Sequence, residues 1–139
     1  MIRRLAYSNP PAETVGSVSL SPQPGYTWLI REIIVSSVLT STVGDRSLQL
    51  EIYHASVSDA IATSVSEILF NSALTASASV GWYYGPIPGV VVSGITTSTA
   101  VLLQTPIYIT ADDSLRINAG SYLASDYLQW VIILEEVLG

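Results

Sequence analysis

Apolar residues recur at every second position in much of this chain, and this alternation limits the fold more than any other feature. Residues 47–53 (SLQLEIY) and 126–137 (DYLQWVIILEEV) show it most clearly. Side chains on a β-strand point alternately to its two faces, so each segment predicts a strand with one buried face. The second segment is long enough for a central strand. The side chains predicted to form the core are Trp28, Ile30, Leu48, Leu50, Ile52, Trp130, Ile132 and Leu134.

Residues 27–40 (TWLIREIIVSSVLT) predict another long strand, but its alternation is interrupted. Ile30 and Ile33 are both expected to be buried, although two residues separate them. They can share one face of a strand only if a β-bulge at Arg31–Glu32 adds an extra residue. A bulge at Arg31–Glu32 is therefore the condition for residues on both sides of it to share the core face.

The chain as a whole favours an all-β protein, namely an antiparallel β-sandwich or jelly roll with an extended N-terminal arm. About seven to nine short strands, separated by turn residues and without a long helix, are typical of these architectures. Residues 1–24 contain four prolines, which fix φ and remove backbone donors. We therefore assign residues 1–24 to the arm, which adds at most one edge strand, and residues 25–139 to the β-sandwich domain.

Charge and hydropathy exclude some partners and favour others. The chain is 49% hydrophobic and 12% charged, with a net charge of −6. Its cations are five arginines, two adjacent near the N-terminus and three dispersed through the sequence. No basic patch is present to neutralise phosphates, so we predict no nucleic-acid binding. No apolar run approaches the roughly 18 residues of a membrane span, so we predict no membrane partner. The mean hydropathy of +0.47 instead predicts a surface covered by protein, and we expect a homo-oligomer, first of all a homotrimer.

No motif in the sequence indicates catalysis, a cofactor or a metal ion. His54 has no accompanying G-x-S-x-G motif, and we interpret it as a loop histidine. Asp112 and Asp113 lie in a predicted turn, where aspartates bond nearby backbone, and lack the spacing of a calcium loop. We therefore predict no enzyme activity and no catalytic, cofactor-binding or metal-binding residues.

Three adjacent aromatic residues lie in residues 80–94 (VGWYYGPIPGVVVSG). Because neighbours on a strand point to opposite faces, at least one ring is expected to point outward. Packing within the subunit, a subunit interface and a carbohydrate platform all stay open, although the apolar surroundings favour a protein contact over a carbohydrate platform. Two arginines near the N-terminus form the densest positive charge and are expected to contact a partner. The proposed interface comprises Arg3, Arg4, Trp82, Tyr83, Tyr84, Pro86 and Pro88.

The order of several segments resembles that of a known group of proteins. These segments are PGYTWLIREIIV, GDRSLQLEIY, GWYYGP, TPIYITADDSLRINAG and YLQWVIILEE. They resemble small β-sandwich virion proteins of tailed bacteriophages, notably capsid decoration or cement proteins. The resemblance implies a homotrimer on the outer capsid surface that clamps neighbouring subunits of the major capsid protein and reaches across them with a terminal arm. We therefore expect a structural virion protein; the alternative is a phage tail, baseplate or fibre component, including a host-glycan-binding module.

Overall fold

The computed structural model describes residues 2–8, 18–54, 65–88, 90, 92, 97–102, 107–123 and 125–138, and these form strands, turns and loops but no helix. The strands are β1 (Ile2–Ser8), β2 (Val18–Leu20), β3 (Tyr26–Val38), β4 (Arg46–His54), β5 (Val65–Leu74), β6 (Ser79–Gly85), β7 (Thr97–Leu102), β8 (Ile107–Thr110), β9 (Asp113–Gly120) and β10 (Tyr127–Leu138).

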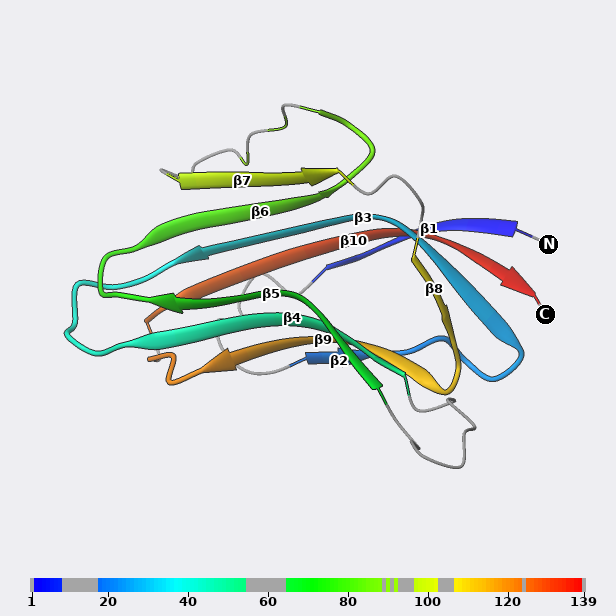
Figure 1. The fold of residues 1–139 in the computed structure, drawn as a ribbon, viewed down its shortest axis with the longest axis horizontal. Helices are drawn as coiled ribbons and strands as arrows, with labels where there is room; N and C mark the ends of the chain where they lie inside the picture. Colours follow the sequence, from blue (N-terminus) through cyan, green and yellow to red (C-terminus); the bar gives the residue numbers. More distant parts are fainter. Residues whose placement is uncertain are drawn as a thin grey trace.

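The strands pair in a nested order. β4 pairs with β5, β3 with β6, β2 with β9 and β1 with β10. The six-stranded sheet has the order β1-β10-β3-β6-β7, with β8 also on β3, and the four-stranded sheet has the order β2-β9-β4-β5 (Figure 1). Among the described pairings, the parallel one is β6 with β7. The predicted all-β sandwich is confirmed, and the nested order is that of a jelly roll.

β3 contains a β-bulge at the position where the sequence required one for a shared core face. In the ladder with β10, Ile133 is opposite Glu32 and Leu134 is opposite Ile30, so Arg31 is the extra residue. Ile30 and Ile33 are consequently both fully buried in the same core. The bulge also divides β3 into two halves, of which the first pairs with β8 and the second with β6.

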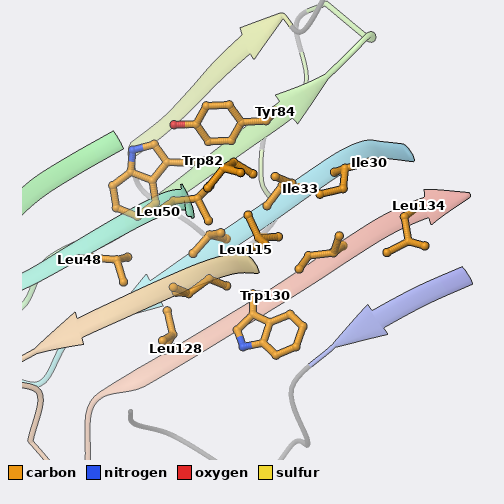
Figure 2. Close-up of a cluster of buried hydrophobic side chains, with 14 of the residues drawn as sticks. Ile30, Ile33, Leu48, Leu50, Trp82, Tyr84, Leu115, Leu128, Trp130 and Leu134 are labelled. Atoms are coloured by element: carbon orange, nitrogen blue, oxygen red, sulfur yellow. The ribbon is translucent and has the colours of Figure 1, made fainter. Parts of the chain in front are cut away.

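The core lies between the two sheets and contains the side chains that the alternation predicted. All eight predicted core residues are buried, with at most 6% of their surface exposed. Figure 2 shows Leu48 and Leu50 of β4 in the same cluster as Trp130 and Leu134 of β10. Their burial supplies the main stabilisation of the sandwich, because apolar burial is the dominant favourable contribution to folding.

The N-terminal segment differs from the prediction of at most one edge strand. β1 pairs with β10 along seven residues, and β2 pairs with β9 along three. Both strands lie at sheet edges, one on each sheet, where they cover backbone groups of β10 and β9 that would otherwise be unpaired. That part of the prediction is wrong, since the prolines fall outside both strands. Residues 9–17 of the predicted arm lie outside the described residues.

The β3–β4 and β9–β10 loops lie at the same end of the sandwich (Figure 1). A buried ion pair between Arg46 and Asp126 connects them. Arg46 Nε and Nη2 donate to the two carboxylate oxygens of Asp126 at 3.0 and 3.1 Å, and both side chains are fully buried. Arg46 also donates to backbone carbonyls in the loop 42–44. Asp126 accepts hydrogen bonds from the backbone N–H groups of Leu123 at 2.7 Å and Thr40 at 2.9 Å. The β3–β4 and β9–β10 loops are therefore held by one network.

We expect Asp126→Asn to lower the free energy of unfolding at neutral pH by about 3–5 kcal/mol, because it leaves the Arg46 guanidinium buried without a counter-charge. Burial alone would raise the pKa of Asp126, but the hydrogen bonds from Arg46, Leu123 and Thr40 outweigh it and hold the pKa below its usual range. A lowered pKa stabilises the fold above the unfolded-state pKa of about 3.9, and this stabilisation is lost as the pH falls through the folded-state pKa.

Urea titrations at several pH values measure both effects. The loss of stability below about pH 4 should be weaker in Asp126→Asn than in the parent chain. Asp45→Asn makes the same chemical change at an exposed neighbour of Arg46 and should change the stability by no more than about 0.5 kcal/mol. Equal effects of the two substitutions would contradict this account of the ion pair.

We expect deletion of Arg31 to be tolerated, whereas deletion of Ile34 from the same strand should prevent folding. Without Arg31, Ile30, Glu32 and Ile33 form a regular alternation that needs no bulge. Without Ile34, one half of β3 must turn its apolar side chains outward, because a slip of one residue exchanges the two faces. Thermal unfolding followed by circular dichroism distinguishes the outcomes. A cooperative transition for the Ile34 deletion, or none for the Arg31 deletion, would show that the bulge has another role.

Candidate functional site

Trp82 and Tyr84 of the predicted interface point into the core (Figure 2). They are 8% and 3% exposed and lie against Phe70 of β5, with ring centroids 4.3 and 6.0 Å from the Phe70 ring. The Tyr84 hydroxyl donates to the Leu69 carbonyl at 3.3 Å, and burial raises the pKa of Tyr84 to about 12. These two rings therefore bridge the six-stranded sheet and the edge strand β5, and they offer little surface to a partner.

Tyr83 points away from the core, as the alternation requires, but it is 1% exposed. Gly81 and Gly85 share its face of β6. A Cβ at Gly85 would lie 2.6 Å from Tyr83 Cζ, and one at Gly81 would lie 2.8 Å from Val92 Cβ. The two glycines thus leave room for the Tyr83 ring and for the chain that folds back over it.

The segment after β6 covers the Tyr83 ring. The backbone N–H of Ile87 donates to the Tyr83 hydroxyl at 3.3 Å. Burial, together with the nearby Glu32 carboxylate, raises the pKa of Tyr83. The prediction that at least one ring points away from the core is confirmed by Tyr83. The prediction that this ring contacts a partner is wrong, because the later chain covers the outward face of β6.

The exposed part of this region is a short proline loop that we define as Pro86, Ile87 and Pro88. All three residues are exposed, and Ile87 has 51% of its surface accessible. Sequence reasoning selected the two prolines and missed Ile87 between them. The glycines on either side of Tyr83 were the local signal that the later chain can pack over this ring, which leaves the proline loop as the exposed part.

The two N-terminal arginines lie at the other edge of the six-stranded sheet. In the ladder of β1 with β10, Arg3 is opposite Glu136 and Arg4 is opposite Glu135. Because β1 is one end of the strand order and β6 and β7 are the other, the structure does not bring the arginines and the proline loop together. The predicted interface is therefore divided: the two prolines and the two arginines lie at opposite edges of the sheet, and the three aromatic residues are buried.

His54 and Asp113 lie close together where β4 ends and β9 begins. His54 Nδ1 is 3.6 Å from Asp113 Oδ1, and His54 Nε2 is 3.7 Å from Glu67 Oε2. Asp113 Oδ2 accepts from the backbone N–H of Thr110 at 2.9 Å, which confirms the predicted turn role of this aspartate. The described residues contain no group of three or more histidine, aspartate or glutamate side chains that could hold a metal ion.

A small cleft opens near the edge strands β1 and β2 of the two sheets, with a volume of about 210 Å³. Trp28 and Glu136 are its buried residues, and Trp28 Nε1 donates to Glu136 Oε2 at 3.0 Å. The Tyr7 ring lies 5.3 Å from the Trp28 ring, centroid to centroid. The cleft residues are Tyr7, Leu20, Ser21, Gln23, Trp28 and Glu136. They come from separate segments of the sequence, so no local motif predicts the cleft.

Comparison with protein-family models, curated proteins and solved structures found no match to this chain.

No helix long and apolar enough to cross a membrane occurs in the described part of the chain.

We expect Gly85→Ala to lower the free energy of unfolding by about 1–3 kcal/mol, because the added Cβ overlaps the Tyr83 ring. In a Tyr83→Ala background the same substitution should cost at least about 1 kcal/mol less, since the colliding ring is gone. Urea unfolding of the four chains in this double-mutant cycle measures the difference. Equal costs in the two backgrounds would mean that Tyr83 does not occupy the space above Gly85.

Proposed function

We propose that this chain is a structural virion protein that binds the outer capsid surface as a homotrimer and stabilises contacts between major capsid protein subunits. The observation that supports the proposal best is the exposed proline loop, which a jelly roll mounts rigidly at one edge of its larger sheet. Jelly rolls serve as viral capsid and lectin domains among other roles, so the fold is compatible with this proposal and with its alternative.

The proline loop is suited to a protein contact. Ile87 presents an apolar side chain between two prolines, and the Tyr83 hydroxyl fixes its backbone N–H from below. Proline restricts φ, so the loop loses little backbone freedom when it binds. An apolar anchor on a rigid base is what the centre of a protein interface requires.

The positions of the two predicted surfaces support a ring of subunits. The proline loop follows β6 towards one edge of the six-stranded sheet, and β1 with Arg3 and Arg4 forms the opposite edge. A head-to-tail contact joins one surface of each subunit to a different surface of the next, and it closes into a ring when the rotation permits. Two unlike surfaces on opposite edges fit such a contact, and a trimer is the ring we propose.

The alternative is a tail, baseplate or fibre component that recognises a host glycan. The cleft beside β1 and β2 is the observation that favours it, because it combines aromatic rings with carboxylate, amide and hydroxyl groups.

Purified capsids assembled without this chain provide the test of the main proposal. We expect the full chain to be trimeric by light scattering, to co-sediment with these capsids and to raise their melting temperature. Ile87→Asp should weaken assembly or capsid binding at least tenfold, because it places a charge in an apolar contact.

Ile68→Asp makes the same change at a residue of β5 with similar exposure, 55%, and should leave capsid binding unchanged. A stable monomer at micromolar concentration that does not bind the capsids would refute the proposal. Equal losses of capsid binding for Ile87→Asp and Ile68→Asp would show that the proline loop is not the contact surface.

A further inference from the structure

The cleft near β1 and β2 has the features of a ligand site rather than of a gap in packing. Its inner end is formed by Trp28 and Glu136, which are 4% and 5% exposed, whereas Ser21 and Gln23 at its mouth are exposed. A buried carboxylate needs partners within the protein, because an ionised group loses hydration there. One oxygen of Glu136 accepts the Trp28 indole N–H, which fixes both side chains at the inner end.

The cleft residues offer several polar groups to a small ligand. The Gln23 side chain makes no hydrogen bond with the described part of the chain, so its carbonyl and amide are open to a ligand. The Ser21 hydroxyl donates to the Asp113 carbonyl at 2.7 Å and keeps its acceptor capacity. The half-buried Tyr7 ring adds apolar surface, whereas Trp28 is 4% exposed and closes the inner end of the cleft. Donors, acceptors and aromatic rings within one cleft match the alternating hydroxyl and C–H surface of a sugar.

Size and charge narrow the class of ligand. A volume of about 210 Å³ is below the roughly 300–1,000 Å³ of pockets for drug-sized molecules, so one small ring is the upper limit. The ladder position opposite Glu136 is Arg3, so the formal charges at this position of the sheet cancel. A neutral ligand therefore fits better than a cation.

We propose that this cleft binds a single neutral pyranose, presented as a free monosaccharide or as the terminal residue of a glycan. This inference specifies the ligand of the glycan-binding alternative above and does not depend on the structural role at the capsid. Gln23 and Ser21 bind hydroxyl groups at the mouth, Glu136 accepts a hydroxyl hydrogen at the inner end, and the half-buried ring of Tyr7 contacts the sugar C–H groups. Affinity for one sugar ring is expected in the millimolar range, equivalent to roughly −4 kcal/mol.

Titration with methyl glycosides tests the proposal on the full chain. The probes are the methyl glycosides of glucose, galactose, mannose, N-acetylglucosamine and N-acetylgalactosamine, followed by NMR of the tryptophan indole N–H signals. We expect at least one glycoside to shift the Trp28 signal and to leave those of Trp82 and Trp130 in place, because Trp28 lines the cleft and the other two tryptophans do not. Absence of any shift with all five glycosides at tens of millimolar would overturn the proposal.

Substitutions at the cleft complete the test. Gln23→Ala should weaken glycoside binding at least fivefold, and Glu136→Gln at least tenfold, because a hydrogen bond to a charged group is stronger than one between neutral groups. Gln129→Ala removes the same type of side chain from the exposed outer face of β10 and should leave binding unchanged. Equal affinity of Gln23→Ala and the parent chain would exclude the cleft as the site.

Two further measurements separate this inference from its competitors. Tetramethylammonium serves as a cationic probe. A Trp28 shift with this probe but with none of the glycosides would show that the cleft binds cations and would overturn the proposal. Capsid binding by Gln23→Ala is measured in parallel. Because the cleft and the proline loop are separate, loss of glycoside binding with full capsid binding supports the inference, whereas failure of the parent chain to bind capsids bears on the structural role alone.

Discussion

The β-bulge at Arg31 is the constraint on which the larger sheet depends. β3 is shared by three strands: β10 lies along one side of it, and β8 and β6 lie in succession along the other. The bulge falls between the β8 half and the β6 half and lets both halves face the same core. The chain can therefore pair β8 with the larger sheet and continue directly into β9 of the smaller sheet, so that the short turn 111–112 connects the two layers.

The core could be predicted from the sequence, whereas the strand order could not. Burial of Leu48 and Trp130 follows from local alternation, which is independent of the neighbours that a strand acquires. The bulge could be located for the same reason, since Ile30 and Ile33 disagree in phase within one strand. Pairing of β1 with β10, by contrast, joins the two ends of the chain. Nothing within residues 2–8 specifies that partner, and the prolines that follow favoured an unpaired arm.

The candidate site was harder to predict because facing away from the core is not the same as being exposed. Alternation required at least one ring of the three to point away from the core, and Tyr83 is that ring. Its coverage by Ile87 and Val92, however, depends on how the later chain folds back. The cleft was even harder to predict, because its residues come together only in the folded chain. Glu136 lies next to Glu135 in the sequence, but the two side chains point to opposite faces of β10. Glu136 therefore accepts the Trp28 indole N–H, a contact that Glu135 does not make.

The apolar composition predicted association, but part of the apolar surface is buried within the subunit itself. The outer face of β6 has a second apolar layer, and Phe70 bridges the open edge between the two sheets by stacking on Trp82. Large apolar side chains that remain exposed, such as Val43, Ile87 and Tyr108, lie on separate elements. A contact built on so few side chains is weak for one copy. Under the proposed role a capsid repeats it, and linked copies bind far more tightly than one, because each additional contact is intramolecular. A rigid subunit with small anchors at two edges therefore suits a lattice better than an isolated dimer.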